Sequence, residues 1–111
     1  MPELLQKIYH ALDGLKLTDI IAYDFRTFSP LFDYLFIATA SNERQVHASI
    51  RHLSDELAGI CDVKKMEGAG ADRWILFDLG SVIVNVMHRE EREHYRLENL
   101  FVERPRVTKF E

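Results

Sequence analysis

Residues Trp74–Met87 read WILFDLGSVIVNVM, and this stretch decides the fold. Its two halves, Trp74–Leu79 and Val82–Met87, are rich in aromatic and β-branched residues, which favour β-strands. Gly80 and Ser81 lie between the halves and predict a tight connection. The stretch therefore predicts two consecutive strands joined by a short turn.

Other segments have the composition of strands or the apolar spacing of helices. Asp33–Thr39 is nearly all apolar and predicts a central strand that is buried on both faces. Asp19–Asp24 and Cys61–Met66 predict two further strands, and residues 68–71 predict a turn. The remaining chain segment after the last strand, Arg89–Leu100, is polar and predicts a final helix.

Two amphipathic helices are predicted from leucine, isoleucine and valine residues at helical spacing. The first covers residues 3–14, and the second follows a cap at Ser41 or Asn42 and ends at Gly59. Asn42 and Gln45 have the spacing of a capping box.

The expected order is α-β-β-α-β-β-β-α, which makes an α+β domain with a mixed five-stranded sheet. Along the strand at 74–79, Trp74, Leu76 and Asp78 face one side, and the other side is wholly apolar. If both amphipathic helices pack on one face, the other face exposes apolar surface that needs a partner. The alternative is that the helices or the tail shield both faces.

Composition places the chain among globular single domains. It has 111 residues, is 47% hydrophobic and carries a net charge of −4, which argues against general binding to nucleic acid. Cys61 is the only cysteine, so an internal disulfide is impossible and a reducing cytoplasm is the expected location. The N-terminal residues 1–17 have neither the pattern of a signal peptide nor that of a membrane span.

The residues for catalysis are missing from the places where they would be needed. His88, Glu91 and His94 lie close in sequence, but they do not form an HExxH motif. They therefore indicate a solvated charged helix and not a metal site. Gly80-Ser81 before a strand is similar to the start of the nucleotidyltransferase signature. That chemistry needs carboxylates on the next strand, and Val82–Met87 has none. We therefore expect no enzyme activity, no cofactor and no metal.

Three blocks of the chain resemble the ribosomal silencing factors, the Iojap-related family. The first is residues 34–41 with Arg44-Gln45-Val46, the second is Glu67-Gly68 with residues 74–80, and the third is residues 92–100. The resemblance runs from the first helix to about residue 101. Asn85 stands where the family often has histidine, and Phe101 where it often has tryptophan.

The resemblance implies a nucleotidyltransferase-like fold without the activity, in a domain of residues 1–102 followed by a C-terminal tail of residues 103–111. It implies binding to the large ribosomal subunit through the ribosomal protein numbered fourteen. Occupation of that face would sterically block joining with the small subunit and repress translation. The resemblance also implies a cytoplasmic homodimer without a membrane or a sequence-specific nucleic acid partner. We expect the tail to be mobile.

The partner-binding surface is expected on the sheet face that carries the only tryptophan. Its members are predicted to be Trp74, Leu76, Asp78, Met87, Tyr95, Leu97 and Glu98. Trp and Tyr are favoured interface anchors, and the two acids suit a basic ribosomal protein. Core packing is the alternative role for Trp74, as is helix-to-sheet packing for Tyr95 and Leu97.

Two other functions stay open: a nucleotide-transferring enzyme that uses Asp24 and Asp78, and a dimeric interaction module with an unrelated partner.

Overall fold

The computed structural model describes residues 2–68 and 73–108. In chain order the helices and strands of these residues are α1 (Pro2–Gly14), β1 (Thr18–Asp24), β2 (Tyr34–Ala40), α2 (Glu43–Glu56), β3 (Lys65–Glu67), β4 (Trp74–Asp78), β5 (Val82–His88), α3 (Arg89–Tyr95) and α4 (Leu97–Leu100). The strands form one five-stranded mixed sheet, so the expected α+β class is confirmed. The predicted turn at residues 68–71 lies outside the described residues, apart from Gly68.

The strand order in the sheet is β1-β2-β5-β4-β3. Strands β2 and β5 are parallel, and every other neighbouring pair is antiparallel. All seven residues of β2 are buried, which confirms that the apolar run forms a central strand. The connection from β4 to β5 is the predicted tight turn, in which Gly80 has φ of 95° and the Leu79 N–H donates to Val82 O at 2.9 Å.

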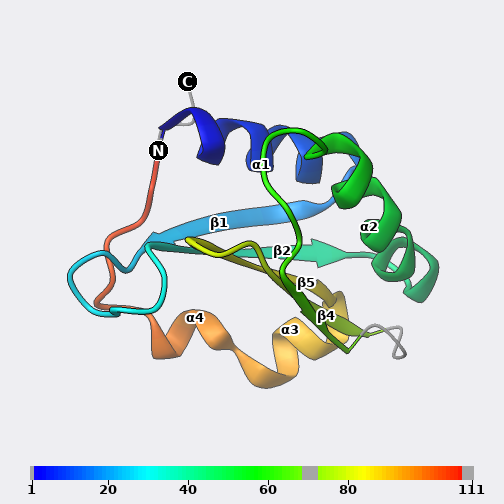
Figure 1. Ribbon diagram of the computed structural model, residues 1–111. Coiled ribbons are helices and arrows are strands. Elements are labelled where there is room, and N and C mark those ends of the chain that lie inside the picture. Colours follow the sequence, from blue (N-terminus) through cyan, green and yellow to red (C-terminus); the bar gives the residue numbers. More distant parts are fainter. Residues whose placement is uncertain (1, 69–72, 109–111) are drawn as a thin grey trace.

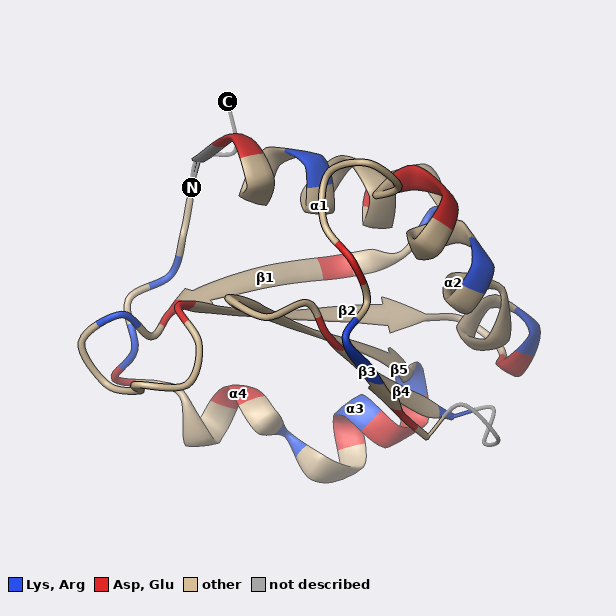
Figure 2. Ribbon diagram, viewed as in Figure 1, with Lys and Arg blue, Asp and Glu red and all other residues tan. Residues whose placement is uncertain are grey.

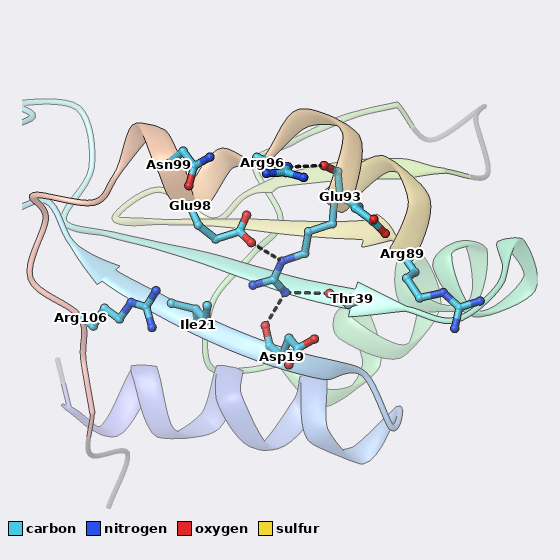
Figure 3. Close-up of a pocket in the computed structure, with 10 residues that line it drawn as sticks. Asp19, Ile21, Thr39, Arg89, Glu93, Arg96, Glu98, Asn99 and Arg106 are labelled. Carbon is cyan, nitrogen blue, oxygen red and sulfur yellow. Dashed lines mark hydrogen bonds and ion pairs between the residues drawn. The ribbon is translucent and has the colours of Figure 1, made fainter.

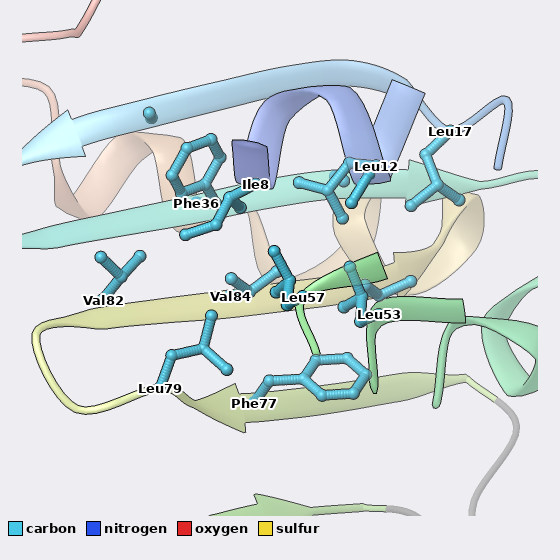
Figure 4. Close-up of a cluster of buried hydrophobic side chains, with 14 of the residues drawn as sticks. Ile8, Leu12, Leu17, Phe36, Leu53, Leu57, Phe77, Leu79, Val82 and Val84 are labelled. Atoms are coloured by element: carbon cyan, nitrogen blue, oxygen red, sulfur yellow. The ribbon is translucent and has the colours of Figure 1, made fainter. Parts of the chain in front are cut away.

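Helices cover both faces of the sheet, but unequally (Figure 1). The long helices α1 and α2 pack side by side on one face and enclose the main core. Figure 4 shows this core, where Leu12 and Leu53 from the helices meet Phe36 and Phe77 from the strands. The short helices α3 and α4 lie on the opposite face (Figure 1). Two amphipathic helices on one face therefore leave the second face to much smaller elements.

The start of α2 is fixed by side-chain hydrogen bonds that the sequence indicates. Asn42 Oδ1 accepts from the Gln45 N–H at 2.8 Å, which confirms the expected cap. The Gln45 side chain accepts from the Ser41 N–H at 2.7 Å, one residue before the N-cap. Gln45 Nε2 also donates to Leu15 O at 2.8 Å, so the same side chain ties α2 to the end of α1.

The structure corrects two of the expected elements. The third strand is residues 65–67, shorter and later than the predicted 61–66. The last helix is not continuous over residues 89–100, because Arg96 adopts the left-handed conformation (φ 48°, ψ 56°) between α3 and α4. This break turns α4 so that Leu97 packs, partly buried, on the second face.

The beginning of the C-terminal tail is paired with the sheet, against the expectation that it is mobile. The Asp24 N–H donates to Pro105 O, and the Val107 N–H donates to Ala22 O, both at 2.8 Å. Arg106 thereby forms an antiparallel bridge with Tyr23. Proline is tolerated at such a position because an edge segment need not donate on its outer side. Residues 105–107 extend the sheet beyond β1.

Candidate functional site

The second face of the sheet carries a smaller apolar cluster beneath α4. Its buried members are Tyr23, Phe25, Leu35, Ile37 and Met87. Leu97 and Phe101 pack against them, and the Phe101 ring lies 5.4 Å from the Tyr23 ring and 5.3 Å from the Phe25 ring. This packing shields the β1–β2 side of the face.

The β4 side of the same face is only partly covered. Trp74, Leu76 and Asp78 are each partly exposed, while Ile75 and Phe77 on the other side of the strand are fully buried. The alternation predicted for this strand is therefore confirmed. Trp74 and Leu76, with Glu67 and Gly68, line a shallow hollow of about 240 Å³. We call Trp74, Leu76, Asp78 and Tyr95 the tryptophan face.

Trp74 is held in one orientation by polar and aromatic contacts. Its Nε1–H donates to Asn85 Oδ1 at 3.0 Å, and Asn85 Nδ2 donates to Phe36 O at 3.3 Å. The Tyr95 ring lies 5.1 Å from the indole, and 51% of Tyr95 is exposed. Because Trp74 keeps exposed surface while its indole N–H is satisfied, it is preorganised for contact at low entropic cost.

The glycine beside this hollow allows a close backbone approach. Gly68 has φ of 81°, and a Cβ at this position would lie 2.3 Å from the Trp74 carbonyl oxygen. A larger residue would therefore displace β3 from β4 or rotate Trp74. The sequence predicted Gly68 as a turn residue and gave Asn85 no role in the site. The hydrogen bond between the buried Asn85 amide and the indole N–H is a tertiary contact, and no local sequence pattern predicts it.

The remaining predicted site residues have structural contacts. Met87 is fully buried, so its side chain supports the face from beneath and offers no surface to a partner. Asp78 Oδ1 accepts from the Gly80 N–H at 2.8 Å and so braces the β4–β5 turn. Leu97 packs partly buried in the smaller cluster. Glu98 lies 3.5 Å from Arg92 in an ion pair. The structure brings Trp74, Leu76 and Tyr95 together, and it places Leu97 and Glu98 on α4.

The polar residues considered for chemistry are engaged elsewhere. His88 Nδ1 accepts from the Glu90 N–H at 3.0 Å and caps α3, and Glu91 Oε1 accepts from Arg73 Nε at 3.1 Å. Within the described ranges, no group of three or more His, Cys, Asp and Glu residues is placed to hold a metal ion. Burial raises the pKa of the Cys61 thiol, which disfavours a reactive thiolate.

Asp24 and Asp78, which a nucleotide-transferring enzyme would need together, lie on strands β1 and β4. Strands β2 and β5 lie between them, so three inter-strand spacings of about 4.8 Å separate β1 from β4 by roughly 14 Å. Carboxylates that hold a catalytic metal pair must lie much closer, because the two ions are about 4 Å apart. Asp24 is also bound to Arg26, whose hydrogen bond lowers the pKa of the carboxyl group. This geometry opposes the enzyme alternative.

No helix among the described residues is long and apolar enough to cross a membrane.

Comparison with known proteins gives consistent matches over nearly the whole chain. A model of the family described as "Ribosomal silencing factor during starvation" matches residues 1–111. Ribosomal silencing factor RsfS of Bacillus subtilis is 41% identical over 97 residues, which cover 86% of this chain and 81% of that protein. Ribosomal silencing factor RsfS of Halalkalibacterium halodurans is 38% identical over 108 residues, or 95% and 91% of the two chains. A crystal structure of a Bacillus halodurans protein superposes with a TM-score of 0.85 at 34% identity, covering 98% of this chain and all of that one (100%).

Proposed function

The chain belongs to the ribosomal silencing factor family, and from this premise we propose that it binds the large ribosomal subunit and sterically blocks joining with the small subunit. The partner in this proposal is the large-subunit protein numbered fourteen. The proposed setting is the cytoplasm, and the proposed outcome is repression of translation.

The observation that carries the proposal is the uneven cover of the sheet. Helices α1 and α2 occupy one face; on the other, the α4 region shields the β1–β2 side and α3 packs against β2 and β5 (Figure 1). The tryptophan face therefore remains partly open, with a fixed indole beside a half-exposed tyrosine. A preorganised aromatic pair next to an apolar hollow is typical of the centre of a protein interface.

The charges at the margin of this face suit a basic partner. Glu67 and Asp78 lie at either end of the β3–β4 pairing, whereas Glu98 on α4 is already ion-paired with Arg92 at 3.5 Å. Ribosomal proteins are rich in lysine and arginine, so these acids would favour encounter and fix orientation more than they would add affinity. A standard interface of about 1,600 Å² would be enough to compete with subunit association.

The mechanism needs no chemical step. A protein that occupies the joining face excludes the other subunit by its volume alone. In the same proposal the fold is nucleotidyltransferase-like and has lost the activity, and two copies form a homodimer. Residues 1–102 carry the binding surface, while residues 103–111 are an appended tail.

The direct test is binding of variants to purified large subunits. Trp74→Ala removes the largest anchor, so we expect the Kd to rise about 30-fold or more, the cost of about 2 kcal/mol typical of a hot spot. Tyr95→Ala removes a half-exposed ring at little risk to folding and should raise the Kd as well. Leu31→Ala is the matched control, because Leu31 is 83% exposed on the β1–β2 loop, away from the tryptophan face.

If Trp74→Ala and Tyr95→Ala both fold, as judged by circular dichroism, and bind with the affinity of Leu31→Ala, the tryptophan face is not the binding surface. Sedimentation with small subunits as well as large ones would instead favour a generic interaction module.

A further inference from the structure

A second hollow, of about 540 Å³, lies between β1 and the α3–α4 pair (Figure 3). Four arginines line it: Arg89, Arg92 and Arg96 from α3 and its end, and Arg106 from the C-terminal segment. Three acids, Asp19, Glu93 and Glu98, lie among them. We call this hollow the arginine groove.

Arg92 belongs to the fold and is not free to bind a ligand by itself. Only 6% of it is exposed, and its Nη1 donates to Thr39 Oγ1 at 2.7 Å and to the Asp19 carbonyl oxygen. Its Nε lies 3.5 Å from a Glu98 carboxylate oxygen, so these two charges offset each other. The floor of the groove is therefore rigid.

The other three arginines have no ion-pair partner among the described residues, although the chain carries a net charge of −4. Arg96 Nε donates only to the Glu93 backbone carbonyl, at 3.2 Å. Arg106 lies 5.7 Å above the Tyr23 ring. Figure 2 shows basic and acidic segments side by side along α3. With Arg92 and Glu98 offset, the free arginines exceed Asp19 and Glu93 by one charge, so the groove favours an anion.

A residue that lines the groove also carries an acceptor without a donor. Glu98 Oε1 is buried and has no hydrogen-bond partner within the part of the chain that the structure describes. An unsatisfied buried carboxylate oxygen costs free energy, but this atom is closed off from the groove, so a ligand does not reach it. The groove therefore selects a ligand by the negative charge that the exposed arginines favour.

The arrangement of these groups favours a chain over a compact molecule. Arg106 and Arg89 lie at opposite ends of the groove, and Glu98 and Arg96 lie between them (Figure 3). None of the described residues that line the groove is aromatic, so a base has no side-chain ring on which to stack. An RNA backbone fits this arrangement, because its phosphates repeat along an extended chain and are bound without stacking of the bases.

We infer that the arginine groove holds the sugar–phosphate backbone of a ribosomal RNA strand next to the protein partner. This inference rests on the proposed function, since it takes the RNA to be that of the large subunit. Phosphate contacts carry no base information. The inference therefore agrees with the expectation that the protein has no sequence-specific nucleic acid partner. Asp19 and Glu93 limit the contact to about two or three phosphates, which adds to binding without giving high affinity for free RNA.

The test is equilibrium binding of the full chain to purified large subunits over a series of salt concentrations. Each phosphate contact releases condensed counterions and contributes about −0.7 to −0.9 to the slope of log K against log salt. The double variant Arg89→Ala/Arg106→Ala should reduce the magnitude of the slope by about 1.5 and weaken binding by tenfold or more. Both side chains are exposed, so the variant should fold.

The control is Arg44→Ala/Arg51→Ala, which removes the same charge from exposed positions on α2, across the sheet. It should leave the slope unchanged. Equal slopes for the two double variants would overturn the groove as an RNA site, and binding that still depends on Trp74 would then leave the proposed function standing. If the unaltered chain does not bind large subunits at all, both the proposed function and this inference fail.

Discussion

Arg92 is the residue that joins the small helices to the sheet. It lies on a helix whose sequence is polar throughout, yet it is buried and bonds to β1, β2 and α4. The pattern of residues 89–100 indicates only a solvated helix, because one buried guanidinium among charged and polar neighbours does not change the period. Its role comes from tertiary contacts alone.

Arg92→Ala should therefore destabilise the protein strongly. It would leave Thr39 Oγ1 and the Asp19 carbonyl without their donor and Glu98 without its counter-charge, at a cost of about 3 kcal/mol. Urea unfolding measures this cost. Arg51→Ala, which breaks only an exposed pair with Asp55 at 3.6 Å, should change stability by less than about 0.5 kcal/mol. Equal effects of the two substitutions would show that Arg92 does not anchor α3.

The Asp24–Arg26 pair predicts a small acid-sensitive contribution to stability. Hydrogen bonds from the Arg26 side chain lower the pKa of Asp24 in the folded chain, relative to about 3.9 in an unfolded one. The stabilisation is thus complete above that ordinary pKa and is lost as the pH falls through the lowered folded value. In an NMR titration, Arg26→Ala should raise the Asp24 pKa. An unchanged pKa would assign the shift to other groups.

At Trp74, the residue types predict the side of the strand on which the indole lies but not the contacts that it makes. The sequence correctly placed Trp74, Leu76 and Asp78 on one side of a strand, because a strand alternates strictly with period two. It could not show that Met87 is buried opposite Trp74, or that Asn85 orients the indole, since both facts depend on the register between β4 and β5.

At the scale of elements, the C-terminal segment is the main surprise. The tail was expected to be mobile, but its residues 105–107 pair with the edge of β1. The free edge of β1 is a stronger determinant, because exposed strand N–H and C=O groups seek partners. Residues 105–107 supply these partners, and Val107 packs partly buried against the main core.

Removal of residues 105–111 should expose the β1 edge. We expect the free energy of unfolding to fall by about 1–3 kcal/mol and the Asp24 amide, which loses Pro105 O, to exchange hydrogen faster. Native-state hydrogen exchange followed by NMR measures both. Removal of residues 109–111 alone is the control and should leave Asp24 protected. Full protection of Asp24 in the longer truncation would show that the tail does not seal this edge.

The break at Arg96 was also beyond sequence reasoning. A left-handed arginine is uncommon, and glycine is the usual signal for such an end. Here the burial of Leu97 and Phe101 on the sheet outweighs the local preference of the backbone.

At the scale of the whole molecule, the sequence predicted one sheet with two long helices, and an exposed apolar face if both helices pack on the same side of the sheet. Hydrophobic periodicity was sufficient for α1, α2 and four of the strands, because burial dictates their patterns, but it misplaced β3. The distribution of helices over the two faces was left open. In the structure α1 and α2 lie together on one face, and α3 and α4 cover part of the other. The tryptophan face is therefore smaller than a whole uncovered sheet face, but it remains partly exposed.

The most direct measurement of the central claim is subunit joining, followed by sucrose-gradient sedimentation of purified large and small subunits. With saturating protein, the joined particles should decrease and the free subunits increase, with the protein found only in the large-subunit fraction. Trp74→Ala should restore joining at the same concentration. Normal joining while the unaltered protein remains bound to the large subunits would contradict steric exclusion.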